Sequence, residues 1–242
     1  MTPHPCTSTR TKGSRSQVIH QSSIIAETRL LVISDIHGHK DGCQRLLEAA
    51  AYDPLVDTLL LLGDYIDADQ PASWSTLDFV QKLVEGGAKA IPGNQELKLA
   101  SMLRRRGSAY RRYANWIGSL PLYIKRPPYL FVHAGIRPGR TLRSQTASDL
   151  TEIREEFYLQ PESRLPGKYR IVFGHTPTFK LGAPSGLLWA DSRRIGIDTG
   201  AKHGCRLTLL DLSGSIAYSC QTFGGYVSGS EVRMESVASL LA

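Results

Sequence analysis

The sequence lacks the features that would place the chain in a membrane or in an oxidising compartment. Its longest apolar run, residues 58–62, is far too short to span a bilayer, and the first residues have no continuous apolar stretch typical of a secretory signal. Only four cysteines occur in 242 residues, and no two of them form a CxxC pair. We therefore expect reduced, mostly structural thiols in a cytoplasmic protein without a membrane partner.

The chain also lacks a balance of charge, because its formal net charge is +7 and the excess is unevenly placed. Residues 1–28 carry three basic side chains against one acid, Glu27, among Ser, Thr and Pro. That composition predicts a disordered or loosely attached basic arm that contributes little to catalysis. A second basic cluster, residues 104–106 with Arg111 and Arg112, is either the solvated face of a helix pair or a surface that attracts phosphorylated partners. No nucleic-acid motif accompanies it, so a nucleic-acid partner is not expected.

Strands and helices alternate from residue 29 onward. Three buried apolar strands are expected at residues 30–33, 58–62 and 89–91. Each is followed by a segment with helical apolar spacing, at residues 41–52, 75–85 and 96–106. Three such units at a repeat of about thirty residues predict right-handed crossovers and a mostly parallel core.

The second half of the chain is richer in strands. Five short apolar segments bounded by Gly or Pro are predicted strands, at residues 129–133, 169–173, 194–197, 205–212 and 215–220. A helix over residues 148–158 interrupts them. The expected fold class is α/β, as an α+β sandwich in which two mixed β-sheets pack face to face with flanking helices. This single domain would cover residues 29–225, followed by a C-terminal tail at 226–242.

Polar residues cluster where the predicted strands end. The five turns read SDIHG, GDYID, GNQE, HAG and GHT in chain order. Ligands of open α/β sheets bind outside the carboxyl ends of the strands, so all five turns are expected to line one crevice. Two of their aspartates, Asp35 and Asp64, combine with one asparagine and three histidines into a set of hard oxygen and borderline nitrogen donors. This mixture suits Mn, Fe or Zn rather than a calcium cage or a thiolate zinc site.

The ordered series SDIHGH, GDYIDAD, GNQE, HAGIRPG and FGHT resembles the calcineurin-like metallophosphoesterases. Within them it is most similar to the phosphoprotein phosphatase branch, which includes bacterial Ser/Thr protein phosphatases and symmetrical diadenosine tetraphosphatases. The resemblance covers residues 29–220.

The resemblance implies a metallophosphoesterase fold and a centre of two divalent ions, Mn²⁺ first and Fe or Zn as alternatives. It implies that the ligands are Asp35 and His37 at the first metal, Asp64 as the bridge, and Asn94, His133 and His175 at the second. A hydroxide that bridges the two ions would attack phosphorus in line.

The chain departs from the family at the residue after Asn94. The family has GNHE, whose histidine protonates the leaving oxygen, whereas this chain has Gln95. A carboxamide donates hydrogen bonds but does not deliver a proton near pH 7. Asp67, which orients the histidine in the family, is expected to accept a hydrogen bond from the Gln95 amide.

A second departure concerns the arginines that bind the phosphate. The family reads GDxxDR, but Ala68 follows Asp67 here. The other arginine is predicted to be Arg154, in the stretch EIREEF, although it could instead be a surface arginine paired with a neighbouring glutamate. Arg137 is a weaker candidate. The remaining histidines are not expected to bind metal: His39, His203, His4 and His20.

The resemblance favours hydrolysis of phosphomonoesters, with phosphoserine or phosphothreonine on proteins as the first hypothesis. One alternative is a dinucleoside polyphosphate hydrolase that uses the same site. Another is a weakly active pseudophosphatase that binds phosphorylated partners, which Gln95 and Ala68 both favour. The expected partner is a phosphorylated protein or a small phosphoester.

Overall fold

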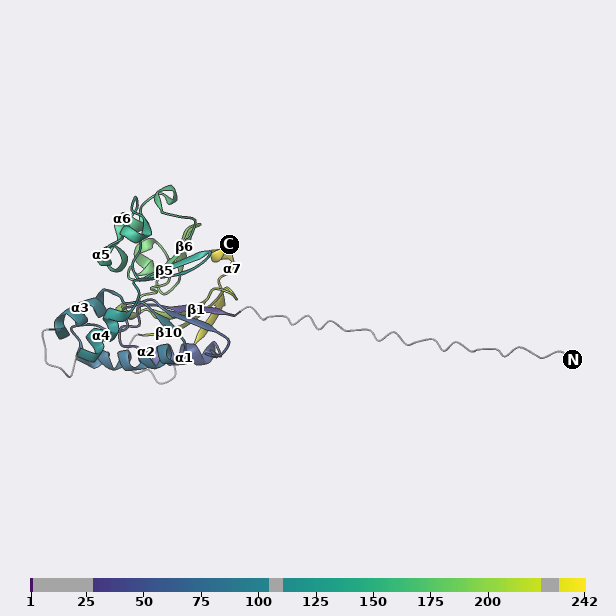
Figure 1. The fold of residues 1–242 in the computed structure, drawn as a ribbon, viewed down its shortest axis with the longest axis horizontal. Coiled ribbons are helices and arrows are strands. Elements are labelled where there is room, and N and C mark those ends of the chain that lie inside the picture. The colour runs from purple at the N-terminus through teal and green to yellow at the C-terminus, as the bar shows by residue number, and fades with distance from the viewer. Residues whose placement is uncertain (2–27, 105–110, 223–230) are drawn as a thin grey trace.

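Two β-sheets lie one above the other, and helices cover their outer sides (Figure 1). This architecture comes from a computed structural model that describes residues 1, 28–104, 111–222 and 231–242. The predicted basic arm falls almost entirely outside the described residues. The predicted α/β sandwich of two mixed sheets is confirmed.

The larger sheet has the strand order β11-β10-β9-β1-β2-β3 within the described residues. Strand β1 pairs in parallel with β2, and β2 pairs in parallel with β3, as the strand–helix repeat predicted. Strands β9, β10 and β11 extend the sheet antiparallel to their neighbours. The bounds are β1 (Leu30–Ile33), β2 (Thr58–Leu61), β3 (Lys89–Ala90), β9 (Arg206–Asp211), β10 (Ile216–Gln221) and β11 (Arg233–Ser236).

The smaller sheet has the order β4-β5-β6-β8-β7. Its three central strands are parallel, and both edge strands are antiparallel. The bounds are β4 (Tyr123–Arg126), β5 (Tyr129–Val132), β6 (Arg170–Phe173), β7 (Trp189–Ala190) and β8 (Arg194–Gly196).

Helices flank the two sheets on opposite sides. In Figure 1, α1 (Lys40–Ala49) and α2 (Ser75–Glu85) lie below the larger sheet, and α3 (Asn94–Arg104) and α4 (Arg111–Ser119) lie at its left side. Above the smaller sheet lie α5 (Ala147–Thr151) and α6 (Glu155–Tyr158), and α7 (Ala238–Leu241) closes the chain. Short 3₁₀ turns are η1 (Pro71–Trp74), η3 (Leu142–Ser144), η4 (Glu162–Arg164), η5 (Thr178–Leu181) and η6 (Ala201–His203). None of the helices in the described ranges has the length and apolarity needed to cross a membrane.

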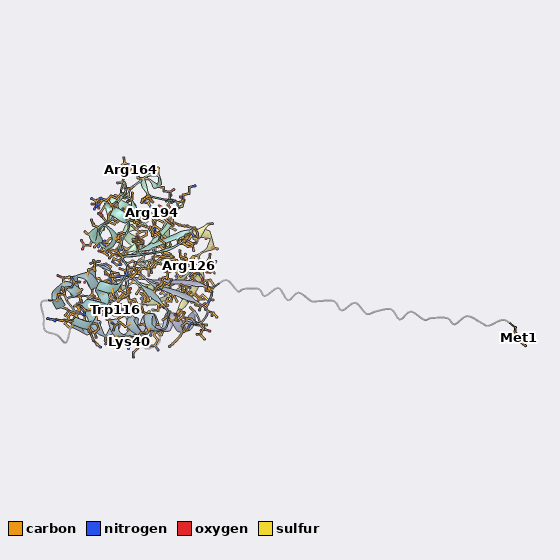
Figure 2. All side chains as sticks on the ribbon, viewed as in Figure 1. Met1, Lys40, Trp116, Arg126, Arg164 and Arg194 are labelled. Carbon is orange, nitrogen blue, oxygen red and sulfur yellow. The ribbon has the colours of Figure 1, made fainter. Side chains whose placement is uncertain are left out.

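The central strands are buried on both faces, which explains their unbroken apolar sequences. In β1, Leu30 and Val32 pack into the layer between the sheets, whereas Leu31 and Ile33 pack against the helices. The stick view shows side chains filling this inter-sheet layer near Arg126 (Figure 2). Arg126 donates a hydrogen bond to Thr28, which joins the edge of the smaller sheet to the residues before β1.

Two expectations about chain segments need correction. The predicted helix over residues 148–158 is two short helices, because the backbone leaves helical geometry at Glu152 and Arg154. The predicted C-terminal tail is part of the fold within its described residues, since β11 pairs with β10 and continues the larger sheet. Its side chains are mostly exposed, so the apolar pattern that marks a buried strand is missing there.

Candidate metal centre

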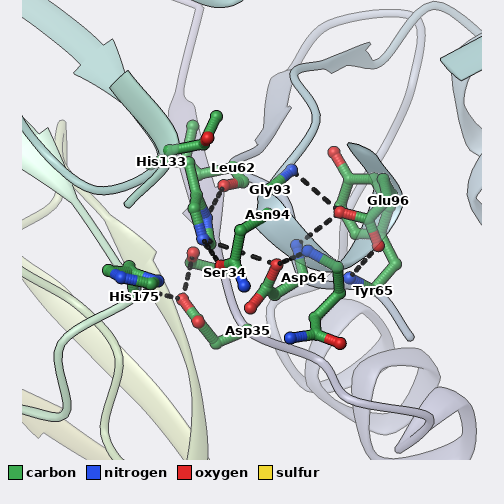
Figure 3. A network of polar contacts seen from close by, with 12 residues as sticks. Ser34, Asp35, Leu62, Asp64, Tyr65, Gly93, Asn94, Glu96, His133 and His175 are labelled. Carbon is green, nitrogen blue, oxygen red and sulfur yellow. Dashed lines mark hydrogen bonds and ion pairs between the residues drawn. The ribbon is translucent and has the colours of Figure 1, made fainter. Parts of the chain in front are cut away.

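The six predicted ligands converge where strands of both sheets end, and Figure 3 shows them except for His37. They come from five turns that are far apart in sequence. Asp35 and His37 follow β1 and Asp64 follows β2, Asn94 begins α3 directly after β3, and His133 and His175 follow β5 and β6. The structure therefore brings the side chains of these five turns close together.

The backbone at these turns is unusual. Four of the six residues have a positive φ, namely Asp35 (54°), His37 (45°), Asp64 (51°) and His175 (65°). Residues other than glycine rarely adopt this left-handed backbone conformation, which costs roughly 1–3 kcal/mol at each residue. The surrounding fold therefore holds the side chains in place against a local preference.

The side chains form two groups that share one carboxylate. Asp35, His37 and Asp64 make the first group, and Asp64, His133 and His175 make the second. Within each group the potential ligand atoms lie within 4.8 Å of one another. Asp64 thus occupies the position that a bridging ligand requires.

The histidines of the second group present lone pairs to this space. His133 Nδ1 lies 2.8 Å from the carbonyl oxygen of Leu62, which can only accept a hydrogen bond, so Nδ1 donates to it. Its Nε2 lone pair then faces Asn94 Oδ1 at 3.2 Å and Asp64 Oδ1 at 3.4 Å. His175 Nε2 is buried without a hydrogen-bond partner in the described structure. Electron-rich atoms that face one another fit a bound cation.

The charges of the first group are strongly coupled. Burial alone would raise the pKa of Asp35, but hydrogen bonding to His37 and the electrostatic effect of His133 lower it to about 2. Burial opposes the charged form of His37, yet hydrogen bonds to Asp35 and Asp67 raise its pKa to about 10. Burial raises the pKa of Asp64, and the neighbouring Asp35 adds to this effect. A metal ion at His37 would have to displace its proton.

Burial instead lowers the pKa of His175 to about 3, and His133 and Arg154 act in the same direction. The ring of His175 is therefore neutral at physiological pH, which is the form that binds metal.

Glu96 clamps two of the ligand turns together, a role that the sequence did not reveal. Its fully buried carboxylate accepts hydrogen bonds from the backbone N–H groups of Asp64 (2.8 Å), Tyr65 (2.9 Å), Ile66 (3.3 Å) and Gly93 (2.8 Å), as Figure 3 shows in part. Burial and the nearby Asp64 raise the pKa of Glu96 to about 7, while its backbone donors act in the opposite direction. Its place in the first turn of α3 was the available signal.

Two glycines permit the close approach of the turns. A Cβ at Gly93 would lie 2.1 Å from Asp64 Oδ1, and one at Gly174 would lie 2.1 Å from Asp35 Oδ2. Any larger residue at either position would push a ligand carboxylate out of place.

Asp67 and Gln95 do not make the predicted contact with each other. Asp67 Oδ1 instead accepts hydrogen bonds from His37 Nδ1 (3.0 Å) and Lys202 Nζ (2.5 Å). Gln95 Oε1 accepts from the backbone N–H of Ala68 at 3.1 Å. Two cationic donors occupy the Asp67 carboxylate, and they lower its pKa to about 2 although burial acts against them.

The predicted phosphate-binding arginine lies near the second group. Arg154 sits between α5 and α6 rather than on a helix surface, and it donates to His175 O (3.4 Å) and Thr176 Oγ1 (3.3 Å). Arg137 donates a hydrogen bond to the Asp149 carboxylate, which also accepts one from Arg140 at 2.6 Å.

The remaining described histidines, His39 and His203, lie outside both ligand groups. His4 and His20 lie outside the described residues. Of the cysteines, Cys43, Cys205 and Cys220 are free thiols, whereas Cys6 is not among the described residues.

Comparison with known proteins identifies the family. The sequence pattern of the calcineurin-like phosphoesterases matches residues 28–210, so the chain belongs to the calcineurin-like phosphoesterase family. The resemblance stated from the motifs is thereby confirmed.

Two relatives carry the same name. A symmetrical bis(5'-nucleosyl)-tetraphosphatase from Vibrio cholerae is 32% identical over 145 residues, which are 54% of this chain and 52% of that protein. A protein of the same name from Baumannia cicadellinicola is 32% identical over an alignment of 260 residues, covering 74% of this chain and 87% of the relative. The chain thus spans only about half the length of the first of these relatives.

Solved structures share the fold. The crystal structure of a candidate diadenosine tetraphosphatase has a TM-score of 0.65 at 24% identity, covering 83% of this chain and 96% of that one. A protein serine/threonine phosphatase from Saccharomyces cerevisiae has a TM-score of 0.50 at 15% identity, covering 87% and 80%.

Proposed function

We propose that this chain is a binuclear metal-dependent phosphoesterase whose substrate is a dinucleoside polyphosphate. The observation that carries the proposal is the pair of ligand groups that share Asp64. A single metal site would not need two separate sets of donors around one carboxylate.

The proposed first site consists of Asp35 and His37, and the second of Asn94, His133 and His175, with Asp64 common to both. Mixed carboxylate, amide and imidazole donors favour Mn²⁺, with Fe or Zn as alternatives. When bound, two such ions polarise the phosphoryl oxygens and activate a water molecule for attack on phosphorus.

The residues of the chain itself would bind and orient the substrate. Arg154, between the two short helices, would donate hydrogen bonds to the phosphoryl oxygens from the side of His175. Gln95 would hold the turn after β2 through Ala68 and would supply no proton to the leaving oxygen.

The missing proton donor favours a phosphoanhydride over a serine phosphate. Symmetrical cleavage of a dinucleoside tetraphosphate adds water across the central P–O–P bond and releases two nucleoside diphosphates. The leaving oxygen then belongs to a phosphate, which is weakly basic and leaves without protonation. A serine alkoxide is strongly basic, and loss of general acid catalysis typically costs about 10²–10⁴-fold in rate. The names of the relatives support the same substrate class.

A second candidate is a weakly active pseudophosphatase that binds phosphorylated partners. Two observations favour it: the Gln95 side chain is engaged with the backbone, and Ala68 stands where the family has an arginine. The phosphoserine hypothesis from the sequence remains the third possibility to be compared.

Parallel assays on three substrates would decide between these functions. With added Mn²⁺, we expect kcat/KM to be highest for diadenosine tetraphosphate, intermediate for p-nitrophenyl phosphate and lowest for a phosphoserine peptide. Preferential turnover of the phosphopeptide would refute the substrate proposal. Tight phosphopeptide binding without turnover of any of the three would establish the pseudophosphatase instead.

A further inference from the structure

The side chain of Lys202 places a positive charge close to the proposed ligands. Lys202 lies in a loop that contributes none of the six. It lies in η6, between Gly200 and Gly204, whose φ angles of 88° and 70° turn the chain sharply on either side. Its Nζ lies 2.5 Å from Asp67 Oδ1. The same oxygen lies 3.0 Å from His37 Nδ1, so the ammonium is two contacts away from the proposed first metal site.

The loop is anchored while the lysine tip is accessible. Thr222 Oγ1 donates to Ala201 O at 2.9 Å, and the N–H of Cys205 donates to Gly200 O at 3.0 Å. The Lys202 side chain is 44% exposed, whereas that of Asp67 is 11% exposed. The ammonium therefore lies at the boundary between the buried ligands and solvent, where a substrate would approach.

The turn after β2 offers no cation of its own. Ala68, directly after Asp67, is fully buried and packs in the core between the larger sheet and its helices. Lys202 reaches the neighbouring Asp67 carboxylate from a different element. Lys202 therefore places a positive charge beside the turn after β2, where the local sequence has none.

We propose that Lys202 binds the phosphates on the leaving side of a polyphosphate substrate. This inference rests on the proposed function of the site. An ammonium group has three N–H donors, and Asp67 uses one of them within the described structure. The other two can bind phosphate oxygens while the pairing of Asp67 with His37 stays intact.

The rival role for Lys202 is purely positional. In that case its charge would only hold Asp67, and through Asp67 the ring of His37. Removing it would then weaken metal binding and reduce turnover of every substrate alike. A role toward leaving-side phosphates predicts a loss confined to ligands that carry phosphate on both sides of the scissile bond.

The decisive experiment compares Lys202→Ala, Lys202→Arg and a matched control, Lys98→Ala, in the full chain loaded with Mn²⁺. Lys98 forms an ion pair of the same 2.5 Å length with Asp69, two residues beyond Asp67. Unlike Asp67, the Asp69 side chain is largely exposed, and so is that of Lys98. Each variant is assayed with diadenosine tetraphosphate and with p-nitrophenyl phosphate. ADP binding is measured by titration calorimetry, and metal content by elemental analysis.

We expect Lys202→Ala to lower kcat/KM for diadenosine tetraphosphate by about 10- to 100-fold and to weaken ADP binding to a similar degree. Turnover of p-nitrophenyl phosphate should stay within about threefold of the parent, because its leaving group carries no phosphate. Lys202→Arg should recover most of the loss, and Lys98→Ala should resemble the parent. Metal content should be the same in all.

Equal losses on both substrates together with loss of metal would overturn the inference and establish the positional role. If the parent does not hydrolyse diadenosine tetraphosphate, the proposed function fails on its own. The calorimetry then still decides on Lys202, since ADP binding that is absent in the parent or unchanged in Lys202→Ala would refute its phosphate-binding role.

Discussion

Replacing Glu96 by glutamine tests whether one buried carboxylate holds the ligand turns together. Each oxygen of Glu96 accepts from two backbone N–H groups: Oε2 from Asp64 and Gly93, and Oε1 from Tyr65 and Ile66. A glutamine has one carbonyl oxygen, which would stay with the pair at 2.8 Å. Its NH₂ group would then face the N–H groups of Tyr65 and Ile66, donor against donor.

The loss is one good hydrogen bond to a charged group, at 2.9 Å, and one weaker bond at 3.3 Å. Bonds to charged groups contribute about 1.5–3 kcal/mol each, but glutamine also removes the cost of the buried charge that raises the pKa of Glu96. We therefore expect Glu96→Gln to lower the free energy of unfolding by about 2 kcal/mol. Denaturant unfolding of the metal-free protein at pH 8, above the raised pKa of Glu96, would measure this. Glu48→Gln, at an exposed carboxylate that accepts from Gln44, is the control and should change stability by less than about 0.5 kcal/mol. A change below about 1 kcal/mol in Glu96→Gln would refute the clamp.

Three further predictions concern the site and its support. Gln95→His should raise turnover of a phosphoserine peptide by about 10²-fold but that of p-nitrophenyl phosphate far less, and equal gains would mean that residue 95 does not face the leaving group. Asp64→Asn should lose more than one equivalent of metal by elemental analysis, whereas full occupancy would contradict a shared ligand. Burial opposes ionisation of Asp149, but hydrogen bonds from Thr146 and Arg137 hold its pKa below the usual range. Its stabilising effect is therefore present above its unfolded pKa of about 3.9 and is lost as the pH falls through the folded pKa. Asp149→Asn should accordingly cost about 2 kcal/mol at pH 7 and progressively less below about pH 4, as urea unfolding at several pH values would show.

The sequence predicted the central strands because both of their faces are buried. Unbroken apolar segments such as Leu30–Ile33 leave little doubt about burial, and their polar continuations pointed to the ligand turns. The edge strands escaped prediction for the opposite reason. Tyr123–Arg126 and Arg233–Ser236 have half-buried and exposed side chains without regular alternation, and Trp189–Ala190 has only two residues, so none carries a clear periodic signal.

Contacts that depend on tertiary structure could not be predicted from local sequence patterns. The motif series predicted the proposed ligand residues, but one of the two partners of Asp67 comes from a loop 135 residues further along the chain, at Lys202. No local pattern links two positions at such a separation. The break at Arg154 also escaped notice, because the glutamates after it favour a helix whether or not that helix continues from the one before.

The left-handed turns at Asp35, His37, Asp64 and His175 have a practical consequence for anyone who engineers this protein. Glycine adopts that conformation freely, so replacing any of the four by glycine would relieve roughly 1–3 kcal/mol of backbone strain, against about 0.5–1 kcal/mol of additional chain entropy, while deleting a proposed ligand. Selection for heat resistance alone would thus favour variants that have lost the metal centre. A thermostability screen on this chain must therefore be paired with a metal-binding readout from the first round, or it will enrich for well-folded proteins that no longer do any chemistry.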